Sequence, residues 1–281
     1  MNKRTLELSQ LNDYKAHLIS EEKSKLTVDK YIHDISRLYD YMKDDVITKI
    51  SIVQYKNKLI SEGYATRSIN SILASINGFF RFLGWNDCCV KSLKLQNEIF
   101  RSEEKELTKA DYYKLVKSAN KCGNKRIALI LQTICGTGIR VSELKYITVE
   151  AAKSGRARVC CKAKLRDVFI VKELSKKLLQ YAKTKGILSG AIFISKNGNP
   201  IDRTSVWREM KKLCDIAELN PTKVYPHNLR HLFARIFYSV EKDIVKLADI
   251  LGHSSINTTR IYMISTGAEH SKRLEMMKLI I

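Results

Sequence analysis

Apolar residues recur with a helical period through the first part of the chain. One strongly periodic segment begins at Thr27, which can cap a helix. Its inward positions are Val28, Tyr31, Ile32, Ile35, Leu38, Tyr39 and Met42. Further helices are expected at 51–62 and 66–83, each closed by a glycine, and at about 6–20. The pattern predicts a four-helix domain with an aromatic and aliphatic core.

A polar segment without helical periodicity follows at about 86–106. Thr108 to Asp111 then offers a capping box, which predicts the start of a new helix. We therefore expect a linker at about 86–106. It would join an N-terminal domain, residues 1–100, to a second domain, residues 105–281.

The second domain is predicted to be mainly helical with one basic β-hairpin. Two runs typical of strands, 157–161 and 168–171, flank a turn at 162–167. One helix is expected to begin at Thr108, and the others to cover 125–135, 172–184, 202–217, 226–239, 242–250, 255–263 and about 268–280. The predicted fold class is therefore mainly α with a small antiparallel sheet.

The charge of the chain is strongly positive and unevenly distributed. The 281 residues carry 50 Lys and Arg against 29 Asp and Glu, for a net charge of +21. Residues 1–100 hold 15 basic and 12 acidic side chains, a net of +3, which leaves 35 basic and 17 acidic, a net of +18, for residues 101–281. This excess favours nucleic acid as a partner over an anionic membrane, although a lysine-rich solvated surface would give the same count.

Cysteine usage and hydropathy are typical of a reduced cytoplasmic protein. The seven cysteines form an odd set without a CxxC motif, no zinc-type ligand spacing is present, and no signal peptide is evident. No apolar run approaches the roughly 20 residues that span a bilayer. We expect neither a metal site nor an association with a membrane.

Three clusters in the second domain carry the side chains that phosphodiester chemistry needs. They are Arg140, then His227 with Arg230, then His253 with Tyr262. A guanidinium can bind two phosphate oxygens, a histidine can hydrogen-bond or move a proton, and a tyrosine hydroxyl can attack phosphorus. Each residue alone is more often a surface arginine, a capping histidine or a core tyrosine. The prediction therefore depends on their occurrence together.

The sequence around these clusters resembles the three signature boxes of the tyrosine recombinase family, which includes phage integrases and Xer-type recombinases. The boxes are the segments 136–144 (GTGIRVSEL), 226–231 (PHNLRH) and 251–262 (LGHSSINTTRIY). They occur in the family order, and the resemblance covers the chain closely from about residue 105 to its end. Residues 1–100 match only in general character.

The resemblance implies a tyrosine recombinase fold and a set of site residues. The first domain would be a four-helix core DNA-binding domain of the SAM-like type, and the second an α-helical catalytic domain with a small sheet. Tyr262 would be the nucleophile. The residues around the phosphate would be Arg140, His227, Arg230 and His253. Neither a metal nor a cofactor is implied, because the bond energy is kept in the covalent link.

Supporting roles follow from the same resemblance. Glu143 would buttress Arg140, and His231 and Arg235 would provide support or packing. A lysine in the hairpin turn would protonate the leaving 5′-oxygen. Lys162 matches that position best. Lys164 remains an alternative, because the chain lacks the glycines that often flank this lysine and a proline that is common later in the hairpin.

The implied reaction forms a 3′-phosphotyrosyl bond and then a Holliday junction between two duplexes. It would take double-stranded DNA with paired inverted core half-sites and a tetramer, either of this chain alone or with a related recombinase. The tail helix would dock in trans on a neighbour, with a helix folded back on its own domain as the alternative. The protein would serve integration and excision, inversion or dimer resolution, in the bacterial cytosol at the nucleoid.

Three alternatives remain open at the level of the sequence. A type IB topoisomerase uses a similar tyrosine chemistry as a monomer and relaxes supercoils without joining partners. A catalytically silent regulator of the same fold would bind DNA without forming an adduct. A plain transcription factor would explain the charge and the helices but not the three boxes.

Overall fold

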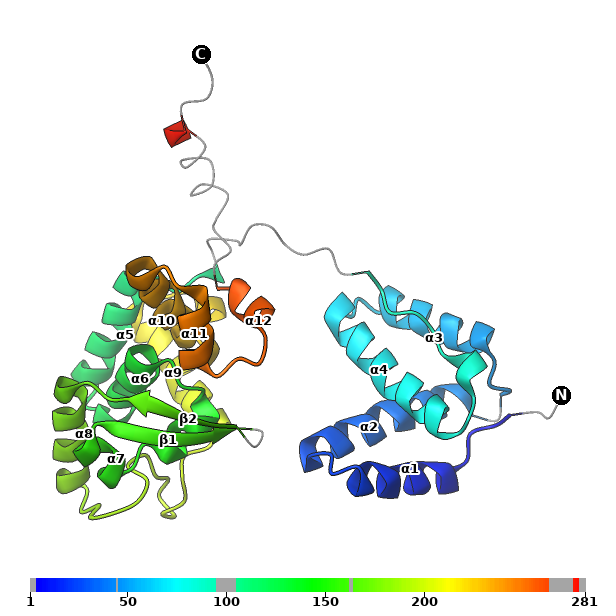
Figure 1. Cartoon of the computed structure of the whole chain (residues 1–281), viewed down its shortest axis with the longest axis horizontal. Coiled ribbons are helices and arrows are strands. Elements are labelled where there is room, and N and C mark those ends of the chain that lie inside the picture. The colour runs from blue at the N-terminus through cyan, green and yellow to red at the C-terminus, as the bar shows by residue number, and fades with distance from the viewer. Residues whose placement is uncertain (1–3, 44, 95–104, 162–163, 263–274, 278–281) are drawn as a thin grey trace. The chain divides into compact units, whose positions relative to one another are not determined.

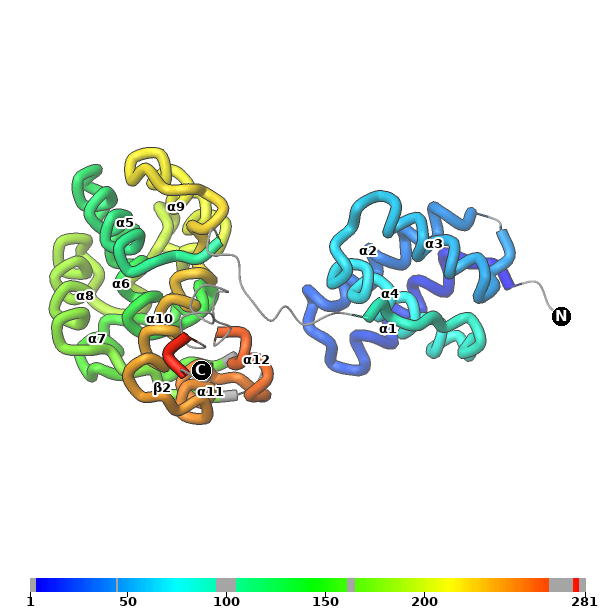
Figure 2. Tube along the Cα trace, turned by 90° about the horizontal axis from the view of Figure 1, so that it is seen from above, coloured from blue at the N-terminus to red at the C-terminus, as the bar shows by residue number. Residues whose placement is uncertain are grey.

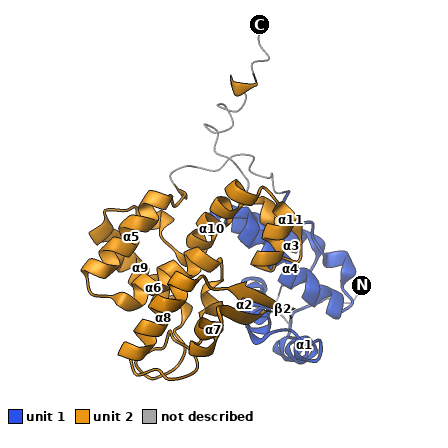
Figure 3. Cartoon of the chain, turned by 60° about the vertical axis from the view of Figure 1, so that its left-hand side comes forward, with its two compact units in different colours: residues 1–97 blue, residues 98–281 orange. Residues whose placement is uncertain are grey.

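The computed structural model describes residues 4–43, 45–94, 105–161, 164–262 and 275–277. The chain divides into two compact units, residues 1–97 and residues 98–281, which Figure 3 colours separately. Each unit has its own hydrophobic core.

Unit 1 is the predicted bundle of four helices (Figure 1). They are α1 (Leu8–Ser20), α2 (Lys25–Met42), α3 (Lys49–Ser61) and α4 (Thr66–Phe82). Their apolar faces meet in a core whose fully buried residues include Ile35, Leu38, Ile52, Leu73 and Phe79. The predicted cap of the second helix is wrong by one turn. Ser24 is the N-cap, and its hydroxyl accepts a hydrogen bond from the Thr27 amide.

The segment after α4 belongs to unit 1, although the sequence suggested that the linker begins there. It starts with the 3₁₀ helix η1 (Asn86–Cys88). The Asn77 side chain donates to the Val90 carbonyl and accepts from the Val90 amide, and Asn70 does the same for Leu93. Such side-chain contacts to an extended backbone leave no periodic signal in the sequence. Residues 95–104 of the predicted linker lie outside the described residues.

Unit 2 is built around α6, which lies at its centre (Figure 1). The helices of this unit are α5 (Lys109–Lys121), α6 (Lys125–Thr137), α7 (Val149–Ser154), α8 (Lys172–Thr184), α9 (Arg203–Ala217), α10 (Pro226–Glu241), α11 (Ile244–Leu251) and α12 (Ile256–Arg260), with the 3₁₀ helices η3 (Val141–Tyr146) and η4 (Pro221–Lys223). Helices α5, α8 and α10 pack against α6, whose Ile127, Ile130 and Ile134 are fully buried. The capping box predicted at Thr108 and Asp111 is confirmed at the start of α5.

The hairpin differs from its prediction in length. Strand β1 (Arg156–Cys161) pairs antiparallel with β2 (Lys164–Phe169), and Cys161 faces Lys164 in the register. The predicted turn at 162–167 was therefore too long, and β2 begins earlier than expected. Its first residues, Lys-Leu-Arg-Asp, are mostly charged and do not look like a strand. From Leu165 onward the side chains nevertheless alternate between the two faces of the hairpin. Leu165 is exposed, whereas Arg166 and Val168 lie on the face that also carries the buried Val159.

The C-terminal elements gather at one end of unit 2, where α10, α11, α12 and β2 lie together (Figure 2). Helix α10 runs two residues further than expected, and α12 is shorter than the predicted 255–263. The predicted tail helix at 268–280 falls almost entirely outside the described residues. Within the described ranges, no helix combines the length and apolar character needed to cross a membrane.

Candidate active site

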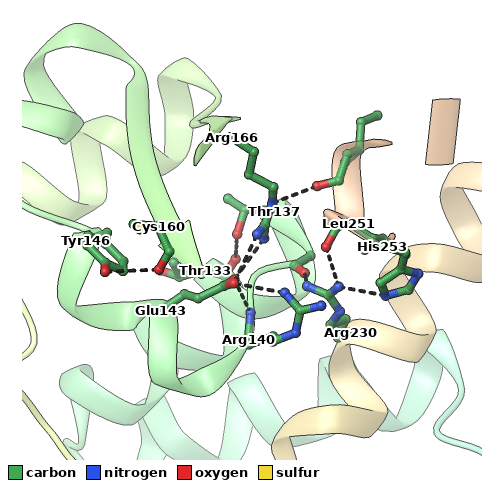
Figure 4. Close-up of polar contacts among 12 residues, drawn as sticks. Thr133, Thr137, Arg140, Glu143, Tyr146, Cys160, Arg166, Arg230, Leu251 and His253 are labelled. Carbon is green, nitrogen blue, oxygen red and sulfur yellow. Dashed lines mark hydrogen bonds and ion pairs between the residues drawn. The ribbon is translucent and has the colours of Figure 1, made fainter. Parts of the chain in front are cut away.

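Five of the predicted site residues come together from three separate segments of unit 2. Arg140 follows α6 and is the N-cap residue of η3, while His227 and Arg230 lie in the first turns of α10. His253 lies between α11 and α12, and Tyr262 comes directly after α12. Figure 4 shows Arg140, Arg230 and His253 at one site.

The backbone at the end of α6 is contacted by Arg230. Gly138 is the C-cap in the left-handed conformation, with φ of +67°, which favours glycine. A Cβ atom at this position would lie 2.4 Å from Cδ1 of Phe233, so no side chain fits. The Gly138 carbonyl accepts a hydrogen bond from Nη1 of Arg230 at 2.5 Å. This glycine therefore links the first two sequence boxes.

Arg230 is the most deeply buried charged group of the site, with 1 % of its surface exposed. Its Nη2 donates to the Leu251 carbonyl at 2.6 Å and lies 3.0 Å from Nε2 of His253. Burial, followed by the nearby charge of Arg140, lowers the pKa of Arg230 to about 10. Among the described residues no carboxylate forms an ion pair with Arg230. Within the described chain, the hydrogen bonds of Arg230 therefore go to neutral groups.

Arg140 is held by Glu143, which lies three residues further along the chain. Glu143 is 2 % exposed and belongs to the 3₁₀ helix η3. It accepts from the Arg140 amide at 2.8 Å and from Nη1 of the Arg140 side chain at 3.0 Å. The Arg140 side chain remains 31 % exposed, so part of its guanidinium can reach a ligand.

Arg166 is a member of this network that sequence reasoning missed. Its Nη1 and Nη2 donate to the two carboxylate oxygens of Glu143, at 3.0 and 2.8 Å (Figure 4). Burial by itself would raise the pKa of Glu143, but the hydrogen bonds from Arg166 and Arg140 outweigh it and hold the pKa below its usual value. No pattern in the sequence marked this residue, because its inward position is visible only in the register of the folded hairpin.

His253 is held in one orientation by two neighbours. Its Nδ1 lies 2.8 Å from the buried hydroxyl of Thr259, and its Nε2 faces the guanidinium of Arg230. Burial lowers the pKa of His253 to about 4, and the charges of Arg230 and Arg140 add to the effect. The imidazole is therefore neutral at pH 7. Because a guanidinium only donates, we assign Nε2 as the acceptor and place the proton on Nδ1.

Tyr262 lies among three histidine rings and is 3 % exposed. Its ring stacks on His253, with 5.6 Å between centroids and 18° between planes. His231 meets Tyr262 edge to face at 4.4 Å, and His227 lies 6.4 Å away. Tyr262 is thus part of an apolar cluster, and its hydroxyl also interacts with Arg230.

The two candidate lysines of the hairpin are not distinguished by the structure. Lys162 lies outside the described residues. The backbone of Lys164 begins β2, but its side chain also lies outside the described part of the chain. Both stay predictions from the sequence.

Arg235 and Asn228 fix the start of unit 2 to the helix that carries the site. Arg235 of α10 donates to the Glu106 carboxylate and to the Leu107 carbonyl, and Asn228 donates to the Lys105 carbonyl. The last residues of the predicted linker, Lys105 and Glu106, are therefore anchored to α10. Among the residues that the structure describes, no group of three His, Cys, Asp or Glu is placed to hold a metal ion.

Comparison with known families gives two matches in chain order. Residues 11–87 match the N-terminal SAM-like domain of phage integrases, and residues 105–269 match the phage integrase family. The SAM-like domain and the mainly helical fold with a two-stranded antiparallel sheet confirm the predicted fold class.

Individual proteins agree with the family match. The tyrosine recombinase XerA of Pyrococcus horikoshii is 31 % identical over 96 % of this chain and 94 % of its own length. The tyrosine recombinase XerD of Staphylococcus aureus is 26 % identical over 85 % of this chain and 88 % of its own length. A structure of lambda integrase, a tetramer bound to a Holliday junction, shares the fold with a TM-score of 0.75 and 21 % identity over 93 % of this chain and 78 % of that one. The resemblance predicted from the three boxes is confirmed, and the chain belongs to the phage integrase family of tyrosine recombinases, enzymes that cleave and rejoin DNA.

Proposed function

We propose that this protein is a site-specific recombinase in which Tyr262 attacks a DNA phosphodiester bound by Arg140 and Arg230. The observation that carries the proposal is a buried guanidinium without a carboxylate partner in the described chain, beside a tyrosine and a neutral histidine. A second cation, Arg140, lies close enough to lower the pKa of Arg230. Two neighbouring cations are stabilised by an anion between them, and a phosphate supplies that charge.

The chemical step balances with groups of this chain. The Tyr262 oxygen forms a bond to phosphorus while the bond from phosphorus to the 5′-oxygen breaks, which gives a 3′-phosphotyrosyl link and a free 5′-hydroxyl. The phenol proton passes to one of the three imidazoles around the Tyr262 ring, those of His227, His231 and His253. Lys162 or Lys164 protonates the leaving oxygen. Burial and then the charges of Arg230 and Arg140 lower the pKa of His253, and a bound phosphate would oppose the effect of these charges. The imidazole can then take a proton and hydrogen-bond the phosphate oxygen.

The partner is double-stranded DNA with paired inverted core half-sites. Two exchanges through a Holliday junction require four protomers, either of this chain or with a related recombinase, and the lambda integrase tetramer on a Holliday junction supports this arrangement. Tyr262 lies beside Arg230 of the same chain, which favours cleavage in cis. Residues 1–100 would bind the core DNA, and residues 105–281 would cleave it. We place this activity at the nucleoid in the cytosol, in integration and excision, inversion or dimer resolution.

Covalent trapping tests the proposal. The wild type, Tyr262→Phe and the control Tyr238→Phe, which alters a partly buried tyrosine of the same apolar cluster, are incubated with genomic DNA fragments and denatured. We expect DNA adducts with the wild type and with Tyr238→Phe but not with Tyr262→Phe. The attached sequences should contain inverted half-sites. Relaxation of supercoils by a monomer would support the topoisomerase alternative, and DNA binding without any adduct would support the regulatory one.

A further inference from the structure

Arg166 connects three parts of the site from the inward face of β2. Its side chain is 11 % exposed, and both of its terminal nitrogens bind Glu143. Its Nε donates to the Ile250 carbonyl at 3.1 Å, near the end of α11. Gly252 packs so closely that a Cβ atom there would lie 2.8 Å from Cδ of Arg166. The hairpin is thereby joined to the Arg140 segment and to the turn that carries His253.

The acceptor positions of the Glu143 carboxylate are all occupied by hydrogen bonds from Arg140 and Arg166. A carboxylate has two oxygens and about four acceptor positions. Oε1 accepts from Nη1 of Arg140 and Nη1 of Arg166, and Oε2 accepts from the Arg140 amide and Nη2 of Arg166. Arg140 can therefore give Glu143 only one of its side-chain nitrogens. The remaining nitrogens of its partly exposed guanidinium are left for a ligand.

We propose that Arg166 is a positioning residue for Arg140, which keeps one edge of the Arg140 guanidinium available for the scissile phosphate. It does so by occupying two of the acceptor positions of Glu143. The proposal deepens the function proposed above, since it assigns the group that sets the phosphate clamp. Arg166 itself need not touch the DNA.

Loss of Arg166 should redirect Arg140 rather than merely loosen the fold. Without Arg166, the buried carboxylate would keep two empty acceptor positions and a single cationic neighbour in contact. A guanidinium binds a carboxylate best with two parallel hydrogen bonds. Arg140 would then turn its second nitrogen to Glu143 and away from the phosphate. It follows that removal of the Glu143 charge should restore part of the activity that is lost with Arg166.

The test compares Arg166→Met, Glu143→Gln and the double variant. Arg158→Met is the matched control, because Arg158 lies on the hairpin with its side chain 73 % exposed and faces only Asp167 in the described structure. The first readout is the single-turnover cleavage rate of the duplex on which the wild type is trapped. We expect Arg166→Met to be slower by about 100-fold with DNA affinity preserved, as for the loss of one oriented phosphate donor. Arg158→Met should stay within about twofold of the wild type, as expected for an exposed surface charge.

The double variant decides between positioning and packing. If Arg166 positions Arg140, the double variant should cleave about tenfold faster than Arg166→Met, which corresponds to release of one charged hydrogen bond. If Arg166 serves packing only, the two losses should add, and the double variant should be the slowest. Cleavage by Arg166→Met at the rate of Arg158→Met, or no gain in the double variant, would overturn the proposal.

A second readout needs no DNA and separates this proposal from the function on which it rests. Phenylglyoxal reacts with accessible guanidinium groups, and peptide mass spectrometry reports the labelling of Arg140. We expect labelling in the wild type, about tenfold slower labelling in Arg166→Met, and recovery in the double variant. A wild type that cleaves no DNA but shows this labelling pattern would contradict the proposed function alone. Equal labelling in all variants would contradict the positioning role. If Arg166→Met does not fold, Arg166→Lys, which fills only one acceptor position, should give the same order.

Discussion

Unit 1 and unit 2 each bury a charged side chain, but they surround it differently. In unit 1, Asp34 is 5 % exposed and accepts hydrogen bonds from Lys30 and Ser75, so its charge is balanced. In unit 2, Arg230 is 1 % exposed, and its partners in the described chain are two carbonyl oxygens, the His253 imidazole and the Tyr262 hydroxyl. A balanced buried charge serves the fold, whereas a buried cation held by neutral groups prepares a site for an anion.

The largest effect is expected when the positive charge of Arg230 is kept but its planar guanidinium is removed. Arg230→Lys retains a cation but loses the planar fork that reaches the Gly138 and Leu251 carbonyls together. We expect the single-turnover cleavage rate to fall by about 100- to 1,000-fold, with DNA binding largely kept because other cations supply it. A Lys variant that cleaves at the wild-type rate would show that charge alone suffices.

A second change acts on the backbone that accepts from Arg230. Gly138→Ala would place a methyl group against Phe233 in a left-handed conformation, so we expect a loss of about 3 kcal/mol in the free energy of unfolding. Gly123→Ala is the control, because Gly123 has a similar φ of +68° and no atom within 4 Å of the added Cβ. That variant should lose only about 1 kcal/mol. Urea denaturation measures both values, and equal losses would rule out the packing argument.

The balanced network in unit 1 should respond in stability alone. Lys30→Met leaves the Asp34 carboxylate with Ser75 as its remaining side-chain partner. Because the Lys30 side chain is 40 % exposed, we expect only about 1 kcal/mol of lost stability. The cleavage rate of the DNA-bound protein should not change. A large drop in that rate would show that the unit 1 network also serves the chemistry.

A pH dependence of stability is also expected from His253. Burial and the neighbouring arginines lower its pKa from 6.5 in the unfolded chain to about 4 in the fold. The unfolded state therefore binds the proton first, so this contribution is complete above pH 6.5 and is lost progressively as the pH falls toward 4. The urea midpoint of the wild type should fall more steeply over this range than that of His253→Gln. Parallel curves would mean that His253 is not held neutral.

The sequence predicted the parts of the molecule that depend on local pattern. Periodic apolar residues located the four helices of unit 1, and a capping box located the start of α5 at Thr108. The three boxes identified the family. The same signals could not place β2, because its first residues are charged and their alternation becomes visible only once Arg166 is seen to face inward.

Contacts between distant segments explain most of what the sequence missed. The hydrogen bonds from Asn70 and Asn77 to the backbone after α4 have no periodic signature, so the segment they hold was taken for linker. Arg166 meets Glu143 across 23 positions, and neither residue reveals its partner in the sequence. The burial of Tyr262 between imidazole rings likewise depends on how α10 and α11 pack.

The most direct test of the account is the identity of the covalent bond. Trapped complexes of the wild type would be digested with nuclease and protease, and the modified peptide sequenced by mass spectrometry. The account predicts a nucleotide joined through its 3′-phosphate to Tyr262, with a free 5′-hydroxyl on the released strand. A 5′-phosphate link, or a link to any other residue, would contradict the assignment of Tyr262 as the nucleophile.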